Sequence, residues 1–292
     1  MTAGPVLRCL APGKVNLTLF VGAPRADGMH PLASVVQAVT LADELTLAPA
    51  APGARADEVI CPGVEGENLA ARALAAFRAA TGWDGPPQVL TIDKHVPVAA
   101  GMGGGSSDAA AALRLAAHAA GGAEPALLYE IAARLGGDVP SLLAPGRVLM
   151  TGAGERVRPL RDPGPFGVLV LPSDHALSTP AVYRAFDGLG AARGGAELDA
   201  LEFALSQQQL TPELVHNDLQ AAALSLHPPI GEALAAVEGA GAAHVMVSGS
   251  GPTVFGLFPG AEGVERAQGA AEALGGHAAH PVPPGYGEVR EA

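Results

Sequence analysis

Residues 97–110, which read PVAAGMGGGSSDAA, have the composition of a loop that binds phosphate groups. Glycines at positions 101 and 103–105 let the backbone turn tightly and let a bulky anion approach it. Ser106, Ser107 and Asp108 follow as candidate caps of the next helix. Because a helix N-terminus presents unpaired N–H groups and the positive end of a dipole, the run predicts a phosphate cradle. The alternative is a flexible connector between a strand and a helix.

This loop is not one of the two commoner nucleotide-binding motifs. The P-loop has a lysine directly after its last glycine, where this chain has Ser106. The dinucleotide fingerprint G-x-G-x-x-G fails in both frames, because neither residue 106 nor residue 108 is glycine.

The chain has only two lysines, and both lie beside other polar candidates. Lys14 opens a run in which apolar residues alternate with polar ones as far as Val21, the pattern of a strand. Lys14 and Asn16 therefore share one face of that strand, either as functional groups or as part of a solvated polar surface. Lys94 directly precedes the glycine loop.

Asp138 follows two glycines that end a predicted helix. An aspartate in that position usually caps the next turn, and a chemical role would require partners from elsewhere in the chain.

The composition excludes several classes of function. A net charge of −12 over 292 residues argues against a broad nucleic-acid surface. Two cysteines provide neither a disulfide framework nor a metal cluster. No apolar run is long enough to span a bilayer, and the N-terminus does not resemble a signal peptide. We expect a cytoplasmic protein without membrane or nucleic-acid partners; its oligomeric state stays open.

The elements that must position these residues alternate between strand and helix patterns. Strands are predicted at residues 14–21, 32–48 (one or two strands), 87–93, 166–171, 243–247 and 253–258. Helices are predicted at residues 69–80, capped by Asn68, and at 106–120, 125–135, 198–205, 212–226, 230–237 and 261–274. A further helix begins at Ser178-Thr179-Pro180 and carries Tyr183.

This alternation predicts an α+β fold in two domains, residues 1–160 and residues 161–292. Residues 50–66 are rich in proline and glycine and should be irregular. The tail beyond Pro281 is expected to be poorly ordered.

Three segments resemble the motifs of the GHMP kinases, small-molecule kinases with a two-domain α+β fold. They are APGKVNL at residues 11–17, the glycine loop at 97–110, and SGSGPTVF at 248–255. Four more segments match a branch of this family whose acceptor is a polyol linked to cytidine diphosphate. They are RADGMH at residues 25–30, IDK at 92–94, LGGDVP at 135–140 and NDL at 217–219.

The resemblance implies phosphorylation of a small molecule by ATP with Mg²⁺, in a cleft between the two domains. It assigns Asp138 as the base that takes the proton of the acceptor hydroxyl, with Lys14 beside it to stabilise charge. No protein metal ligand is implied. The ATP site would comprise Asn68, Lys94, Pro97, Val98, Ala99, Ala100, Gly101, Met102, Gly103, Gly104, Gly105, Ser106 and Ser107. The acceptor site would comprise Asn16, Met29, His30, Thr179 and Tyr183, and the turn at residues 248–251 would shape the site from the second domain.

Met29 departs from the branch, which usually has an aromatic residue here that stacks on cytosine. The methionine sulfur still offers a polarizable contact to a ring face, and Tyr183 matches a second aromatic position. Two alternatives stay open. One is a GHMP kinase that acts on homoserine, mevalonate or a sugar, and the other is a GHMP-fold protein that binds its ligand without turnover.

Overall fold

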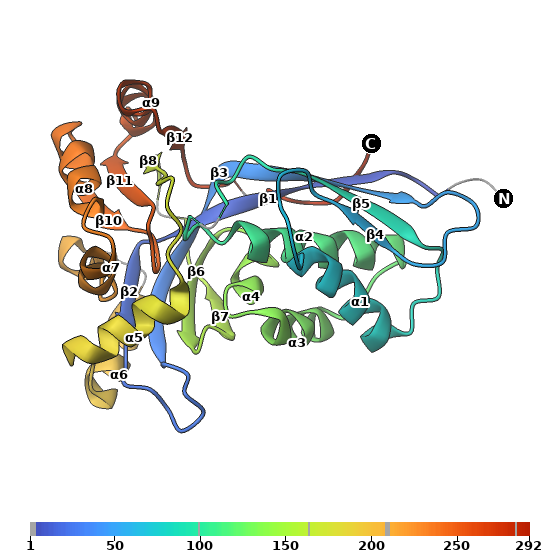
Figure 1. The fold of residues 1–292 in the computed structure, drawn as a ribbon, viewed down its shortest axis with the longest axis horizontal. Helices are drawn as coiled ribbons and strands as arrows, with labels where there is room; N and C mark the ends of the chain where they lie inside the picture. Colours follow the sequence, from blue (N-terminus) through green and yellow to red (C-terminus); the bar gives the residue numbers. More distant parts are fainter. Residues whose placement is uncertain (1–3, 99, 163, 208–210, 284) are drawn as a thin grey trace.

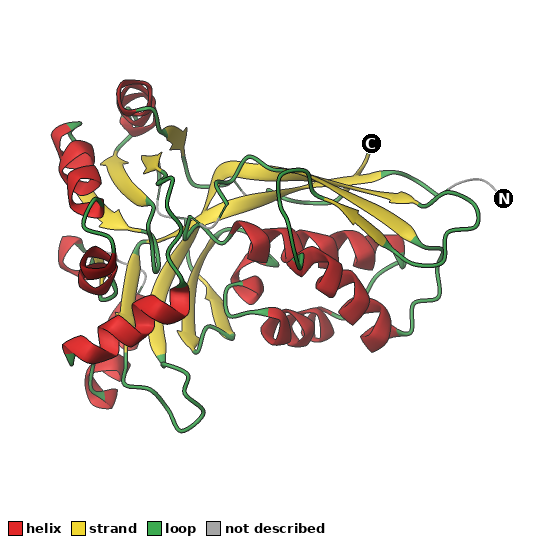
Figure 2. Ribbon diagram, in the orientation of Figure 1, coloured by secondary structure: helices red, strands yellow, loops and turns green. Residues whose placement is uncertain are grey.

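The computed structural model describes residues 4–98, 100–162, 164–207, 211–283 and 285–292. Strands and helices form two layered parts that lie side by side, as the α+β prediction requires (Figure 1). In one part, long strands lie over a layer of helices. In the other, helices cover one face of a smaller sheet, and the opposite face of that sheet packs against the larger sheet (Figure 2). No helix in the described ranges has the length and apolar character needed to cross a bilayer.

The larger sheet is organised around one long central strand. Its strands are β1 (Leu7–Asn16), β2 (Thr18–Val21), β3 (Leu32–Pro49), β4 (Glu58–Ile60), β5 (Gln88–Asp93), β6 (Arg147–Gly152), β7 (Arg156–Pro159), β9 (His216–Asn217) and β13 (Arg290–Glu291). β3 is a single strand of 18 residues that pairs antiparallel with β1, β2, β5 and β6. Its first half is buried on both faces and its second half alternates, because the two layers cover only the first half from both sides.

Four helices cover one face of the first part: α1 (Leu69–Thr81), α2 (Gly104–Ala119), α3 (Pro125–Leu135) and α4 (Val139–Leu142). Asn68 caps α1 as predicted, accepting the Ala70 N–H at 2.8 Å. The alanines of α2 are buried against α1 and β1, since small side chains allow close approach.

The prediction that Ser106, Ser107 and Asp108 cap α2 is wrong. The helix begins at Gly104, two residues earlier than predicted, and Gly103 is the N-cap with a left-handed φ of 68°. All three polar residues therefore lie within the first turns. The helix starts as soon as the left-handed glycine ends the loop, so no side-chain cap is needed.

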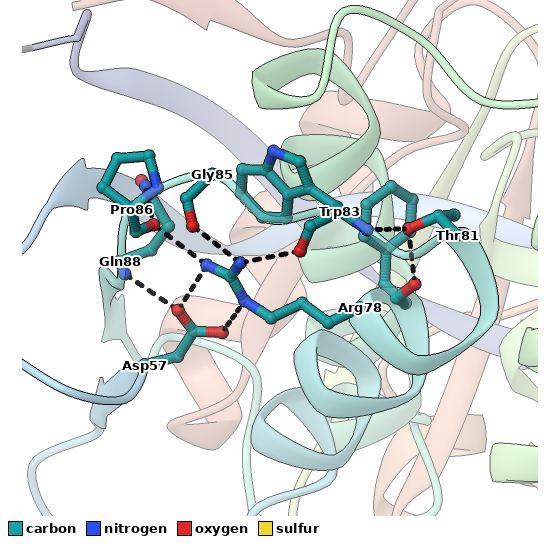
Figure 3. A network of polar contacts seen from close by, with 8 residues as sticks. Asp57, Arg78, Thr81, Trp83, Gly85, Pro86 and Gln88 are labelled. Carbon is teal, nitrogen blue, oxygen red and sulfur yellow. Dashed lines mark hydrogen bonds and ion pairs between the residues drawn. The ribbon is translucent and has the colours of Figure 1, made fainter.

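Arg78 fastens α1 to the segment that leads into β5 (Figure 3). Its guanidinium pairs with both carboxylate oxygens of Asp57 at 2.7 and 2.8 Å and donates to the carbonyls of Trp83, Gly85 and Pro86. Asp57 also accepts the backbone N–H of Gln88, the first residue of β5. This network fixes the start of the strand that enters the glycine loop.

The second part is built on a four-stranded antiparallel sheet in the order β10–β11–β8–β12. Its strands are β8 (Phe166–Leu171), β10 (His244–Val247), β11 (Val254–Pro259) and β12 (His277–Ala279). The helices of this half are α5 (Thr179–Leu189), α6 (Gly195–Ser206), the 3₁₀ turn η1 (Pro212–Leu214), α7 (Gln220–Leu226), α8 (Ile230–Gly239) and α9 (Gly263–Leu274).

Two expectations for the second half are wrong. The predicted helix at 212–226 is interrupted by β9, because residues 216–217 pair in parallel with β2 of the larger sheet. The described residues of the tail beyond Pro281 are ordered: Val282 is buried, the Tyr286 hydroxyl donates to the Thr40 carbonyl at 3.0 Å, and β13 pairs with β1. The irregular segment at 50–66 contains the short strand β4. The domain division at residues 160 and 161 stays a prediction.

Candidate active site

Lys14 and Asp138, predicted from segments far apart in the chain, lie next to each other. The Lys14 ammonium is 3.5 Å from Asp138 Oδ2. It also donates to Asn16 Oδ1 at 2.8 Å and to the Gly101 carbonyl at 2.9 Å. Lys14 is buried, whereas the Asp138 side chain is 34% exposed. A fixed cation beside an accessible carboxylate suits the transfer of a proton and the stabilisation of negative charge.

Asp138 is free to do chemistry because its side chain does not cap the helix that it precedes. It is the N-cap residue of α4, yet its carboxylate makes no capping hydrogen bond. Its backbone carbonyl accepts the Ser141 hydroxyl at 2.7 Å, which holds the turn without using the carboxylate. The Asp138 side chain therefore does not cap the helix, which was the alternative to a chemical role.

Asn16 is held in place by a residue that the sequence did not single out. Its amide donates to Ser34 Oγ at 2.9 Å, and Ser34 in turn donates to the Thr18 carbonyl at 2.5 Å. All three residues are buried in the larger sheet. The chain from the Lys14 ammonium through Asn16 to Ser34 orients the cation toward Asp138.

Gly101 is the point at which the loop meets both β1 and the second half of the chain. Its carbonyl accepts from Lys14 Nζ at 2.9 Å and from Ser248 Oγ at 3.0 Å. Its φ is 73°, and a Cβ built there would be 2.4 Å from the Ser248 carbonyl oxygen. The neighbouring carbonyl of Met102 accepts the backbone N–H of Lys14 at 2.8 Å. Only glycine allows this close approach.

The other loop residues divide into outward and inward groups. Val98 is 61% exposed, while Ala100 and Met102 are buried, so these two can meet a nucleotide only through their backbone atoms. The Ser107 hydroxyl is buried without a hydrogen-bond partner among the described residues. Five other residues predicted for the ATP site lie at the start of α2 or in the segment before it. Gly105 is exposed and the rest are half-buried: Pro97, Gly103, Gly104 and Ser106. Ala99 lies outside the described residues.

We expect Gly101→Ala to weaken ATP binding by about 5- to 100-fold, because a left-handed alanine with a backbone clash costs about 1–3 kcal/mol in this loop. The measurement is calorimetric titration with Mg-ATP. Gly269→Ala is the matched control: this exposed glycine of α9 has nothing within 4 Å of a built Cβ. The control should bind ATP as the wild type does and melt at the same or a higher temperature. Equal ATP affinity in both variants would contradict the structural role of Gly101.

Lys94 and Asn68 are both engaged with protein atoms. Lys94 Nζ donates to Asp43 at 2.5 Å and to Asp108 at 2.8 Å. The Asn68 side-chain oxygen accepts the N–H that it caps. Their predicted contacts with the nucleotide stay predictions; an ammonium has three donors, so Lys94 retains one beyond the two carboxylates.

Two adjoining cavities of about 540 and 250 Å³ open beside the Lys14–Asp138 pair. Asp138, Thr179 and Tyr183 line both. The larger also has Met29, His30 and Ser106 on its wall, and the smaller contains Lys14, Asn16, Gly101 and Gly103. All five predicted acceptor residues therefore line one cavity or the other.

His30 and Tyr183 form the aromatic side of the larger cavity. Their ring centroids are 5.0 Å apart at 42°. His30 Nδ1 must carry a proton, because its 2.9 Å partner is the Gly22 carbonyl, which can only accept. Burial and the nearby Asp138 carboxylate raise the pKa of the Tyr183 phenol to about 12, so the phenol stays neutral. Met29 is 50% exposed at the cavity mouth.

The loop that carries Met29 is shaped by three residues of the RADGMH segment. Arg25 pairs with both oxygens of the Asp27 carboxylate, and Asp27 also accepts the Met29 N–H at 3.0 Å. Gly28 has a left-handed φ of 79°. These contacts explain why the residues of the RADGMH segment occur at this spacing, because each contact spans two residues along the loop.

The turn at residues 248–251 reaches the site from the second half, as expected. A Cβ built on Gly249 would be 3.3 Å from both Lys14 Nζ and Asn16 Oδ1. Ser250 Oγ is 2.9 Å from Thr179 Oγ1. Asn217 holds the turn by donating to the carbonyls of Val247 and Gly249, both at 2.8 Å. The NDL segment therefore acts as a support of the site.

Asp187 also lines the larger cavity and was missed in the sequence. Its Oδ1 is 3.5 Å from His30 Nε2. It follows Tyr183 by four residues, so both lie on one face of α5, and that spacing was the available signal.

Asp218 is the middle residue of the NDL segment, and its carboxylate accepts hydrogen bonds from Arg193, His216 and the Val21 N–H. Burial of Asp218 opposes its ionisation, but these hydrogen bonds outweigh the burial and lower its pKa to about 2.

Comparison with known proteins agrees with this geometry. A model of the N-terminal domain of GHMP kinases matches residues 68–146, and a model of their C-terminal domain matches residues 197–277. A 4-diphosphocytidyl-2-C-methyl-D-erythritol kinase of Streptomyces coelicolor is 45% identical over 280 residues, which cover 90% of this chain and 91% of that protein. A crystal structure of 4-(cytidine 5'-diphospho)-2C-methyl-D-erythritol kinase has a TM-score of 0.76 at 34% identity and covers 94% of this chain and 100% of its own. A homoserine kinase from Cytophaga hutchinsonii, covering 99% of this chain and 98% of its own, has a TM-score of 0.62 at 17% identity and shares the fold alone.

Proposed function

This chain belongs to the GHMP kinase family, and from that premise we propose that it transfers the γ-phosphate of ATP to the 2-hydroxyl of 4-diphosphocytidyl-2-C-methyl-D-erythritol. This phosphorylation is a step in the non-mevalonate route to isoprenoid precursors. The similar proteins that carry the name of this kinase match nearly the whole chain. Both substrates are small metabolites, so we place the reaction in the cytoplasm.

One observation carries the proposal: the Lys14–Asp138 pair lies between the glycine loop and the aromatic cavity. Lys14 binds the loop through the Gly101 and Met102 carbonyls. Asp138 lines the cavity that also contains His30 and Tyr183. A phosphate held by the loop and a hydroxyl held in the cavity would therefore meet at this pair.

In the mechanism, Asp138 accepts the proton of the 2-hydroxyl while that oxygen bonds to the γ-phosphorus. The bond from the γ-phosphorus to the bridging oxygen breaks, and ADP leaves. The Lys14 ammonium lies beside the reacting oxygens and stabilises the negative charge that builds on them. Because Asn16 and Gly101 fix this ammonium, little reorganisation is needed during the transfer.

Mg²⁺ enters this proposal with the ATP phosphates. Within the described residues, no group of three or more His, Cys, Asp or Glu side chains is placed to hold a metal ion. Mg²⁺ in kinases is usually bound by substrate phosphates and water with one or two carboxylates, so its binding does not require such a cluster. When bound, it would neutralise part of the phosphate charge.

The cavity favours a cytidine-bearing acceptor over the acceptors of other GHMP kinases. His30 and Tyr183 provide an aromatic wall and Met29 a polarizable side chain, which suit a planar base. Homoserine and mevalonate offer no ring for such a surface. A binding protein without turnover would not need the Lys14–Asp138 pair.

The test is ADP release by the purified protein with Mg-ATP and, in parallel, 4-diphosphocytidyl-2-C-methyl-D-erythritol, homoserine or mevalonate. We expect turnover with the cytidine substrate alone. Turnover only with another acceptor would discard the assignment of the acceptor cavity but keep the ATP loop. ATP binding without turnover of any acceptor would favour a binding protein.

Tyr183→Ala should raise KM for the cytidine substrate by about 5- to 100-fold, because stacking of a base on an aromatic ring contributes about 1–3 kcal/mol. KM for ATP should stay within about twofold of the wild type, since Tyr183 is not part of the glycine loop. Tyr129→Ala, on an exposed tyrosine of α3, is the matched control. An unchanged KM for the cytidine substrate would show that the base binds elsewhere.

A further inference from the structure

Lys94, Asp43 and Asp108 form a charged cluster buried beneath the glycine loop. The Lys94 ammonium is 2.5 Å from Asp43 Oδ2 and 2.8 Å from Asp108 Oδ2. The side chains of Asp43, Asp108 and Lys94 are 0%, 5% and 13% exposed. The three residues come from β3, α2 and the end of β5, so the cluster joins the sheet to both ends of the loop.

The cluster lies close enough to the loop to affect a ligand bound there. Asp43 Oδ1 accepts the backbone N–H groups of His95 and Val96, at 2.6 and 2.8 Å, where the chain leaves β5 for the loop. A Cβ built on Gly104 would be 3.3 Å from Lys94 Nζ, which places the ammonium beside the first residue of α2. Any phosphate held by this helix N-terminus therefore lies near the three charges.

The two carboxylates are not equivalent. Both oxygens of Asp43 have partners, two N–H groups on one and the ammonium on the other. Asp108 Oδ1 is buried and has no partner among the described residues. A buried carboxylate with one unsatisfied oxygen is costly in its ionised form, and a proton on that oxygen removes the charge while Oδ2 keeps its bond to Lys94.

The electrostatics of the surroundings agree with this asymmetry. Burial raises the pKa of Asp108 to about 7, and Asp43 adds to the rise while Lys94 opposes it. Burial lowers the pKa of Lys94, but the two carboxylates outweigh it and the pKa is raised, so Lys94 stays an ammonium. The Cys9 and Cys61 thiols also face Asp108, and burial raises the pKa of each. Arg114 faces Cys9 and donates to the Leu10 and Leu142 carbonyls.

The charge of the cluster conflicts with the ligand of the proposed function. One ammonium between two carboxylates leaves a net charge of −1 beneath a loop that is to hold a triphosphate. In a buried site, such like charges repel each other more strongly than in water. A neutral Asp108 removes this repulsion and leaves Lys94 paired with Asp43.

We propose that Asp108 is a positioning residue that takes up a proton from solvent when ATP binds, so that the Asp43–Lys94–Asp108 cluster is neutral beneath the bound phosphates. Asp108 acts through Lys94 and the loop and does not touch the reacting atoms. The inference rests on the proposed function only in taking ATP as the ligand of the loop.

The test is calorimetric titration with Mg-ATP, without acceptor, in buffers of different ionisation enthalpy. At pH 7.5 the wild type should take up about three-quarters of a proton more than Asp108→Asn, because a group with a pKa of about 7 is mostly ionised there before ATP binds. Between pH 6 and pH 8, the ratio of the wild-type dissociation constant for ATP to that of the variant should increase by up to about tenfold. Ionisation of the nucleotide contributes equally to both proteins and cancels.

Asp93→Asn is the matched control, because it removes the same charge from the end of β5 at a side chain that is 74% exposed. It should behave as the wild type does. Equal proton uptake by the wild type and Asp108→Asn would overturn the proposal, and so would an Asp108→Asn protein that folds but binds ATP more weakly than the wild type at pH 8. If that variant does not fold, wild-type ATP affinity that is constant between pH 6 and pH 8 is the overturning result.

The failure of this inference can be told from that of the proposed function. ATP binding without the difference in proton uptake overturns the inference alone. Proton-coupled ATP binding without turnover of the cytidine substrate overturns the proposed acceptor alone.

Discussion

Asp138→Asn is expected to lower kcat for the cytidine substrate by about 10²- to 10⁴-fold, the usual contribution of a general base. Asparagine keeps the size and a hydrogen-bonding oxygen but cannot accept the proton. The ATP affinity should change by less than about twofold, because the side chain makes no contact that holds the glycine loop. Steady-state kinetics with both substrates, together with calorimetry for ATP, measure the two effects separately.

Asp84→Asn is the control for this prediction, since Asp84 is an exposed aspartate that lines neither cavity of the site. Its kcat should equal that of the wild type. If Asp138→Asn retains more than about a tenth of the wild-type kcat, the carboxylate is not the base, and its role is limited to orienting Lys14.

Lys14→Met is expected to lower kcat by about 10²- to 10³-fold, the typical loss when one group that stabilises transition-state charge is removed. Methionine fills a similar volume, so the buried site should not collapse. It cannot donate to Asn16 or Gly101, so those two acceptors lose a partner, and the melting temperature should also fall. The measurements are single-turnover kinetics with Mg-ATP and a thermal melt.

Arg8→Met is the matched control, because it removes a cation from the same strand at an exposed position. We expect unchanged kinetics from it. A Lys14→Met protein that loses stability but keeps its single-turnover rate would show that Lys14 supports the loop without stabilising the transferred phosphate.

Periodicity and caps were enough to predict most of the elements. The strands at 87–93 and 166–171 and the helices at 69–80 and 125–135 occur within one residue of the predicted bounds. Each has a strong local signal, such as the Asn68 cap or the Gly-Gly pair after Leu135. Local signals of this kind act through neighbouring residues and so can be read from the sequence.

The misplaced elements depend on partners that are distant in the chain. β9 interrupts a helical pattern because residues 216–217 pair with β2, about two hundred residues earlier. The described part of the tail is ordered because β13 pairs with β1 and the Tyr286 hydroxyl donates to the Thr40 carbonyl. Helical propensity and polarity contain no information about such pairings.

The candidate site shows the same division. The spacing of the glycine loop and of the other family motifs identified the kinase family and the types of group that the chemistry needs, including Lys14 and Asp138. The sequence did not single out two supports of those groups, Ser34 behind Asn16 and Asp187 beside His30. It marked Asn217 only as part of the NDL segment, without its contact with the 248–251 turn.

The sequence by itself determined the family, the candidate phosphate loop and the residue types that the proposed chemistry needs, because these depend on short segments whose order and spacing are visible along the chain. The family resemblance implied that Lys14 lies beside Asp138, but only the tertiary structure decided how the charged side chains are held. Asp138 faces Lys14 and not the helix that it precedes, and Lys94 is bound by Asp43 from β3 and Asp108 from α2. The physical reason is that the energy of a buried charge depends on distances and burial, which strand register and helix packing set between residues far apart in the chain.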